Sequence, residues 1–254
     1  LLSGNNMVDA FHADPTTDLG AWGILINGDN NDIGFNRFQD NIAVCSNQGY
    51  KLASNSIELY TARNNNIHHN IALRDRVFSE LGSSSTVRSS GNTYAYNVFV
   101  TAGSDSRFVT TRGALDTRYG PVDNTYLVHN STYQTGANSS AIACVLGCGS
   151  AVLATDSNIF WADGKVFVAD ATFPNQNDLI WSSSGTPTYS RPVRSSAVVA
   201  NPHYVGPATG NLRLRSASPA IGAGNIVGDW GTDVYGKTLP SGPGTDDVGA
   251  AQFQ

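Results

Sequence analysis

An asparagine pattern recurs along the chain and is the feature that most limits how it can fold. The clearest copies have an asparagine, four intervening residues, a second asparagine and an apolar pair. The second asparagines are Asn36, Asn70, Asn97, Asn130 and Asn158, at intervals of 34, 27, 33 and 28 residues. A motif repeated at such intervals is typical of a solenoid, in which each repeat buries its apolar face only against its neighbours.

Alternation inside each copy predicts a short strand with Ile67 and its equivalents facing inward. Asparagine at one corner of every coil can adopt the left-handed backbone conformation. Its amide can also bond to the asparagine one coil above and so form a ladder. Apolar segments ahead of these corners predict further strands at residues 23–26, 57–60, 78–81, 108–111 and 142–146.

These patterns together predict an all-β chain, a right-handed parallel β-helix of about seven to nine coils with loops at the corners. The alternative is a β-sandwich with asparagine-rich turns. Composition agrees with many strands and turns, because glycine is abundant at 26 residues and charged residues make up only 14%. The net charge of −5, without a basic stripe, argues against a nucleic-acid partner. No run of about eighteen apolar residues predicts a membrane span.

The C-terminal part carries a second recognisable pattern. It contains Leu212-Arg213-Leu214, then Ser218-Pro219-Ala220-Ile221, and later Asp246-Asp247-Val248-Gly249-Ala250. This ending resembles that of many secreted bacterial and fungal β-helix proteins of the pectate-lyase-like superfamily. The resemblance covers about the whole chain and implies the fold, secretion and a carbohydrate ligand. It does not specify the reaction, because that superfamily includes hydrolases, lyases, epimerases and adhesins.

We expect residues 1–254 to form one β-helix domain, with residues 170–196 as irregular coils carrying long loops. Residues 197–254 are expected to form degenerate C-terminal coils and a cap. Because Leu1 reads as the middle of a repeat, we expect further N-terminal coils or a helix, on a separate chain or segment, to cover the first coil.

The chain has three cysteines, Cys45, Cys144 and Cys148. Four residues of straight strand span about 13 Å, too far for a disulfide between the last two. A turn at Gly147 would bring them together, so both a disulfide and two buried thiols stay open.

The only glutamates of the chain, Glu58 and Glu80, take equivalent outward positions in two successive predicted strands. On adjacent coils their carboxylates would lie near the separation of about 5–5.5 Å used by retaining glycosidases. One would stay ionised, and repulsion would raise the pKa of the other towards that of a general acid. The alternatives are two solvated surface acids or a calcium-binding pair.

Asp75, in the corner loop at residues 74–76, is a second candidate acid beside the same groove, with a simple turn residue as the alternative. The predicted substrate-binding residues are His68, Arg76, Arg112, Tyr60 and Asp116. Arg112 would bind a carboxylate or sulfate of the substrate, or else pair with Asp116 at the surface. Of His68 and His69, alternation places one outward and the other inward.

Aromatic side chains at Trp22, Tyr60 and Tyr119 could stack on sugar rings. Chondroitinase-B-type and alginate lyases have similar coils, with a lysine base and an Arg-His-Gly segment. The corresponding positions here read Thr61 and Ser79-Glu80-Leu81-Gly82, so neither catalytic residue is matched.

The leading prediction is a secreted glycoside hydrolase that cleaves a polysaccharide or oligosaccharide through Glu58 and Glu80. The first alternative is a lyase that acts by β-elimination on a uronate-containing glycan. The second is a non-catalytic carbohydrate-binding or adhesin solenoid. No cofactor or metal is expected; calcium stays open for the loop with His12, Asp14 and Asp18, which shows no ordered ligand spacing.

Overall fold

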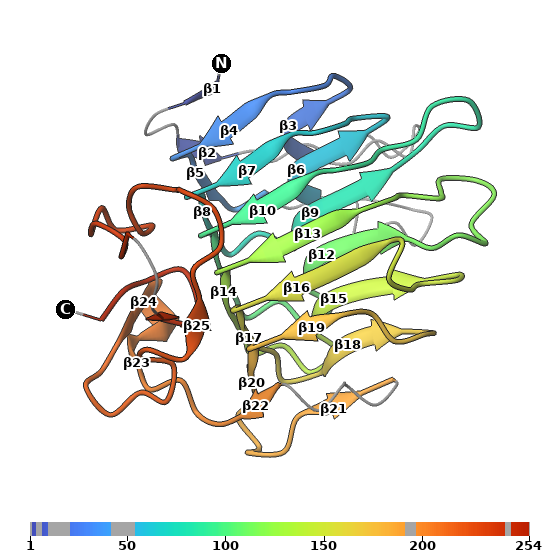
Figure 1. The fold of residues 1–254 in the computed structure, drawn as a ribbon. Coiled ribbons are helices and arrows are strands. Elements are labelled where there is room, and N and C mark those ends of the chain that lie inside the picture. The colour runs from blue at the N-terminus through green and yellow to red at the C-terminus, as the bar shows by residue number, and fades with distance from the viewer. Residues whose placement is uncertain are drawn as a thin grey trace.

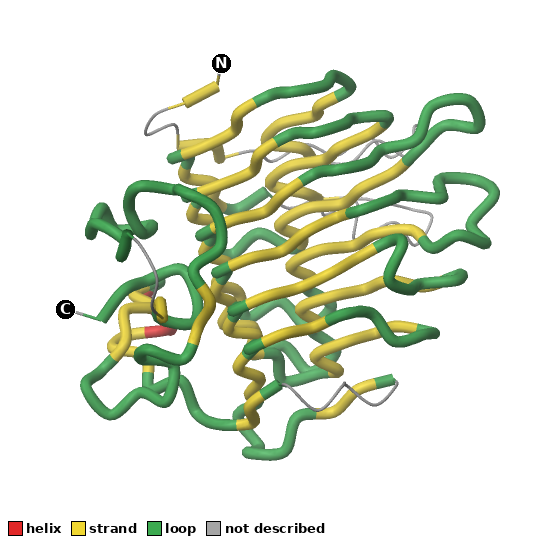
Figure 2. Tube along the Cα trace, in the orientation of Figure 1, coloured by secondary structure: helices red, strands yellow, loops and turns green. Residues whose placement is uncertain are grey.

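The computed structural model describes residues 2–3, 7–9, 21–41, 54–190, 197–241 and 245–253 (Figure 1). The chain is all-β, and most strands belong to three parallel sheets stacked in chain order, as in a parallel β-helix (Figure 2). Within the described residues, no helix has the length and apolar character needed to span a membrane.

From β1 to β21, each sheet takes every third strand, and β22 then follows β20 in sheet B. Sheet A contains β1 (Leu2–Ser3), β4 (Asp32–Gly34), β7 (Asn66–His68), β10 (Thr93–Ala95), β13 (Thr125–Val128), β16 (Leu153–Asp156) and β19 (Asn175–Gln176). Sheet B contains β2 (Met7–Asp9), β5 (Arg37–Gln39), β8 (Ile71–Leu73), β11 (Val98–Thr101), β14 (Ser131–Gln134), β17 (Ile159–Trp161), β20 (Leu179–Trp181) and β22 (Val198–Val199). Sheet C contains β3 (Ala21–Ile26), β6 (Ser54–Tyr60), β9 (Val77–Gly82), β12 (Arg107–Arg112), β15 (Ser140–Val145), β18 (Lys165–Ala169) and β21 (Thr188–Tyr189).

The register follows the sequence repeat. In sheet A, Ile33 pairs with Ile67, Ile67 with Tyr94, and Tyr94 with Leu127. All four side chains are buried and belong to one core that runs along the solenoid. The predicted strands and their inward positions in this sheet are therefore confirmed.

The predicted asparagine ladder stands at the corner between sheets A and B. Each rung donates its backbone N–H and its Nδ2 to the Oδ1 of the next, with backbone N–H to Oδ1 distances of 2.8–3.1 Å. The rungs are Asn36, Asn70, Asn97, Asn130, Asn158 and, as the last one, Asp178. A second ladder at the corner between sheets C and A joins Asn31, Asn65 and Asn92.

We expected the ladder asparagines to adopt the left-handed conformation. Instead, the residue before each of them adopts it. Phe35, His69, Tyr96 and His129 have φ values of 59, 53, 53 and 49°. The corner turns at this residue, and the next asparagine can then direct its donors along the solenoid. A left-handed residue costs about 1–2 kcal/mol. Part of this is offset because the four rings stack, with successive centroids 4.7, 5.4 and 4.8 Å apart.

The C-terminal segment differs from the expected degenerate coils. After β22, its strands form the antiparallel pairs β23 (Tyr204–Gly206) with β24 (Asn211–Leu214) and β25 (Gly224–Asn225) with β26 (Thr245–Asp246). A short 3-10 helix, η1, spans Pro207–Thr209. In Figure 1 this segment lies beside the solenoid, away from the strands of sheet C.

The C-terminal pattern that resembles other β-helix proteins forms the contact of this segment with sheet B. Ala220, Val248 and Ala250 are buried against sheet B residues such as Ile159. The backbone N–H of Ala250 donates to Ser131 Oγ at 2.8 Å. The pattern that carried the resemblance is therefore explained by packing against the solenoid.

Cys144 and Cys148 form a disulfide, with their Cα atoms 5.5 Å apart. Leu146 and Gly147 both have positive φ, so the chain turns sharply and brings the two sulfur atoms together. Of the two open possibilities, the disulfide is the one present. Cys45 lies outside the described residues.

Candidate functional site

The outward face of sheet C carries the two glutamates side by side. Glu58 on β6 and Glu80 on β9 are direct partners in the parallel register. Both are partly exposed, whereas Ile57, Leu59 and Leu81 beside them are fully buried. Adjacent strands are about 4.8 Å apart, so the expected juxtaposition of these two side chains is present.

The surroundings of Glu58 favour its protonated form. Burial raises the pKa of Glu58, and the negative charge of Glu80 raises it further. Asn55 Nδ2 donates to Glu58 Oε2 at 2.9 Å, and this bond, with Trp22 and Arg112 nearby, acts in the opposite direction. The balance is a pKa above the ordinary value of 4.5.

Glu80 is paired with a guanidinium. Arg112, at the end of β12, donates from Nη2 to Glu80 Oε1. Asp116 lies on the other side, with Oδ2 4.0 Å from Arg112 Nε. Asp116 is buried and accepts the backbone N–H groups of Arg118 and Tyr119 at 2.9 Å each. It therefore holds Arg112 and its own loop, and is not itself open to a substrate.

Strict alternation breaks in the strands of sheet C. Phe78 and Ser79 are successive, fully buried residues, and so are Phe108 and Val109. Because Phe108 and Val109 both face inward, the residue before them can face outward. Arg107, partly exposed at the start of β12, therefore shares the outer face with Glu80, and the charges of Glu80 and Arg112 act on it.

Tyr60 is also on this face, at the end of β6 and opposite Gly82. The ring lies over this glycine, since a Cβ added at Gly82 would come 3.1 Å from Tyr60 Cδ2. An aromatic side chain next to the carboxylate pair has the form needed to stack on a sugar.

The prediction that Asp75 is a groove acid is wrong, because its side chain is fully buried. It is a ladder residue at the corner between sheets B and C. Its Oδ1 accepts the backbone N–H of Asn41 at 2.9 Å, and Ser56 Oγ donates to its Oδ2 at 2.5 Å. Burial raises the pKa of Asp75 to about 6.

We predicted that His68 lies beside the glutamates, but it lies on β7 of sheet A. Both histidines of the pair are buried under the C-terminal segment. His68 Nε2 is 2.5 Å from Asp32 Oδ1, and its Nδ1 is 2.8 Å from His69 Nδ1. His69 Nε2 donates to the carbonyl of Thr232 at 2.5 Å, and burial lowers the pKa of His69 to about 4. These contacts attach the C-terminal segment to the solenoid.

Arg76, another predicted substrate-binding residue, pairs with Asp105, with Nη2 3.1 Å from Oδ2. Its guanidinium thus has a partner at the corner ahead of β9 and β12. The structure brings together Glu58, Glu80, Tyr60, Arg112 and Asp116, but not His68 or Asp75.

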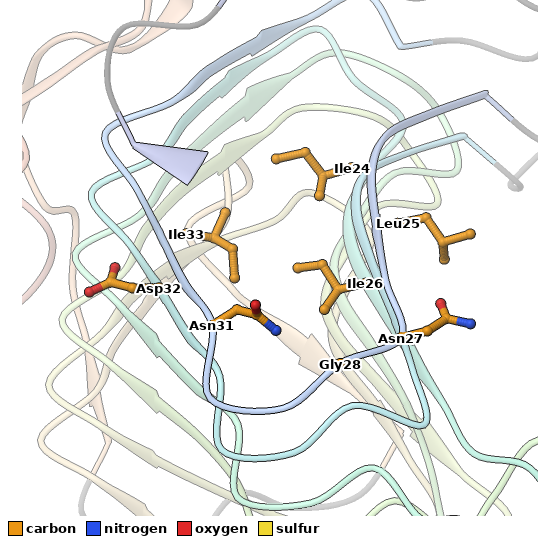
Figure 3. Close-up of a pocket in the computed structure, with 8 residues that line it drawn as sticks. All are labelled: Ile24, Leu25, Ile26, Asn27, Gly28, Asn31, Asp32 and Ile33. Carbon is orange, nitrogen blue, oxygen red and sulfur yellow. The ribbon is translucent and has the colours of Figure 1, made fainter. Parts of the chain in front are cut away.

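A cavity of about 270 Å³ lies elsewhere, between β3 and β4 at the N-terminal end of the described solenoid. Figure 3 shows Ile24, Ile26 and Ile33 pointing into it, while Leu25 and Asp32 point away. Polar residues of the turn between the two strands, Asn27 and Asn31, complete its lining, and neither glutamate is part of it.

Across the described ranges, no group of three or more His, Cys, Asp or Glu side chains has the geometry of a metal site. The loop with His12, Asp14 and Asp18, left open for calcium, lies outside the described residues.

Sequence reasoning missed Arg107 and Asn55 as residues of this face. The structure places them at equivalent positions, since Asn55 pairs with Val77, and Val77 with Arg107. In the strand of Arg107, the two residues that follow it are both buried, so strict alternation did not predict its position.

The fold and this face define a class of protein: an all-β chain of stacked parallel sheets with a carboxylate pair on an outer face. No family model matches the chain, and no curated protein is significantly similar to it in sequence.

Proposed function

We propose that this protein is a secreted glycoside hydrolase of the pectate-lyase-like superfamily, a right-handed β-helix with about seven to nine coils. The observation that carries the proposal is the pairing of Glu58 and Glu80 on an outer face of sheet C. Like charges directly opposite each other destabilise a sheet, so their placement favours a functional role. The disulfide between Cys144 and Cys148 supports secretion, because disulfides persist in oxidising compartments.

In this mechanism Glu58 is the general acid. Its raised pKa lets it hold a proton and pass it to the leaving oxygen of the glycosidic bond. Glu80, held by Arg112, acts as the nucleophile and bonds to the anomeric carbon as the leaving oxygen departs. Water, deprotonated by Glu58, then breaks the bond to Glu80 and releases the sugar. The strand spacing of about 4.8 Å fits the short carboxylate separation of retaining enzymes. Tyr60 would stack on the sugar.

Glutamine variants test these roles against a control. Glu58→Gln and Glu80→Gln should each lower kcat on an oligosaccharide by about 10²- to 10⁴-fold. Asp229→Asn, which changes an exposed acid of the C-terminal segment, should leave kcat unchanged. Full activity of both glutamine variants would refute the assignment.

A substrate with an activated aryl leaving group separates the two roles, because that group leaves without being protonated. It should restore kcat/KM of Glu58→Gln, which reports the first step, but not that of Glu80→Gln. The wild-type rate should fall as pH rises through the raised pKa of Glu58, and this basic limb should disappear in Glu58→Gln.

The products decide between the alternatives. An unsaturated sugar absorbing in the ultraviolet would identify a lyase and refute hydrolysis. Glycan binding without any cleavage would identify a non-catalytic binding solenoid.

A further inference from the structure

Arg107 stands out among the arginines around the carboxylate pair. It is the first residue of β12, paired in register with Val77 of β9 and Ser140 of β15. Its backbone N–H donates to the carbonyl of Arg76 at 3.0 Å, which fixes the base of the side chain. The guanidinium is partly buried on the outer face of sheet C, where the charges of Glu80 and Arg112 act on it.

The two neighbouring arginines both have acidic partners. Arg112 is paired with Glu80, and Arg76 with Asp105. Across the described residues, the guanidinium of Arg107 takes part in no ion pair and donates no side-chain hydrogen bond. Burial of a cation costs free energy, and an anionic partner bound at the guanidinium would offset this cost.

We infer that Arg107 binds an anionic substituent, a carboxylate or a sulfate ester, on the glycan that the carboxylate pair cleaves. The inference rests on the proposed function and adds to it the substrate class. A guanidinium presents parallel N–H donors that match the two oxygens of either group. Burial strengthens such a charged pair, because less water competes for the donors.

The location of Arg107 indicates which sugar carries the charge. Its position is three residues before Thr110, the register partner of Glu80. Three residues of strand span about 10 Å, so the substituent belongs on a ring other than the one that is attacked.

The charge of the whole protein limits how many such substituents the substrate carries. With a net charge of −5, the molecule as a whole repels a polyanion. Glu80 and the nearby Asp105 would add to this repulsion along the same face. One arginine without an acidic partner fits a glycan with isolated acidic sugars, not a uniformly charged chain.

Matched oligosaccharides test the inference. The xylo-, gluco- and galacto-oligosaccharide backbones would each be offered unsubstituted, with one uronate and with one sulfate ester, and kcat/KM measured from released reducing ends. The wild type should prefer one charged form, and the carboxylate and sulfate arms identify which.

In Arg107→Met, the ratio of kcat/KM for the charged over the neutral substrate should fall about tenfold to a hundredfold. Arg107→Lys, which keeps the charge but loses the paired donors, should lie between. Arg88→Met removes one positive charge from an exposed arginine paired with Asp123, and should leave the ratio unchanged. Urea midpoints would establish that each variant is folded.

Two failures can be told apart. If the wild type cleaves glycans but the ratio is the same in Arg107→Met, the inference is wrong and the hydrolase proposal stands. Calorimetric titration with the same oligosaccharides covers the other case. Binding of a charged form that weakens in Arg107→Met, without cleavage, would support the anion site while refuting hydrolysis. Equal binding of charged and neutral forms would overturn the inference.

Discussion

Replacing Asp178 by asparagine should stabilise the protein, and by an amount that depends on pH. Asp178 is the last rung of the ladder between sheets A and B and is fully buried. Its Oδ1 accepts both the backbone N–H and the Nδ2 of Asn158, at 2.8 and 2.9 Å. Its Oδ2 accepts from Thr155 Oγ at 2.5 Å. Asparagine at this position keeps the first two bonds, and its Nδ2 can donate to the threonine hydroxyl.

The magnitude follows from the pKa of the carboxyl group. Burial raises the pKa of Asp178 from its ordinary value of 3.8 to about 7, against the hydrogen bonds from Thr155 and Asn158. At about 1.4 kcal/mol for each pH unit, the ionised form loses about 4 kcal/mol of stability on folding. An amide at this position carries no such loss.

The direction with pH is fixed by linkage. Between pH 3.8 and about 7, folded Asp178 keeps a proton that the unfolded chain has released. Wild-type stability therefore declines through this range from this group, while Asp178→Asn is unaffected. The difference between variant and wild type should rise from near zero at pH 4 to about 4 kcal/mol above pH 7.

Urea unfolding at pH values from about 4 to 8.5, followed by tryptophan fluorescence, would measure this difference. Contributions from distant titrating groups cancel between the two proteins. Asp229→Asn, at an exposed acid, is the control and should show a difference that does not vary with pH. A constant difference for Asp178→Asn, or a variant less stable than the wild type at pH 8, would refute the reasoning.

Three further changes have expected outcomes. Asn97→Ala removes the acceptor of two buried donors of Asn70, and urea unfolding should show a loss of about 2–4 kcal/mol. Gly249→Ala would place a Cβ 2.6 Å from Ser131 Oγ at a φ of 94°, so limited proteolysis should cut the C-terminal segment faster than in the wild type. Glu58→Gln removes a repulsion with Glu80 and should raise the urea midpoint, in contrast to Glu80→Gln, which leaves Arg112 without its partner.

The sequence contained enough to predict the stacking and the glutamate pair. The ladder asparagines align one corner of successive coils, and the apolar centres of the strands align the residues of sheet C. Glu58 and Glu80 have equal offsets from buried neighbours, so their pairing follows once the coils are aligned. No knowledge of side-chain packing was needed for this step.

The residues that could not be predicted are those where a local rule fails. Alternation assigns Phe78 and Ser79 to opposite faces, yet both are fully buried. This break in the alternation hid Arg107. It coincides with the stacking of Phe78 on Phe108, with ring centroids 4.9 Å apart, a contact that sequence periodicity does not encode.

The placement of Asp75 and His68 failed for different reasons. Asp75 follows Asn70 by five residues, as Asn41 follows Asn36, so the spacing did contain the evidence for a ladder residue. His68 is covered by Trp230 and the chain around it, more than 150 residues later. A repeat pattern describes contacts between neighbouring coils only, and cannot anticipate cover from a distant segment.

The same stacking that stabilises this fold also limits where a reactive pair can form. In a ladder, equivalent positions always meet, so amides and apolar groups repeat with benefit while equal charges repeat with repulsion. The chain follows this rule along its buried ladders, where five of six rungs at one corner are asparagine. It departs from the rule on the outer face of sheet C, where Glu58 meets Glu80 and only one of them has a cationic partner.

The C-terminal segment packs its apolar residues on sheets A and B. The uncompensated charges therefore occur on the sheet that this segment leaves accessible, which is the arrangement expected where a substrate, and not the protein, completes the contacts.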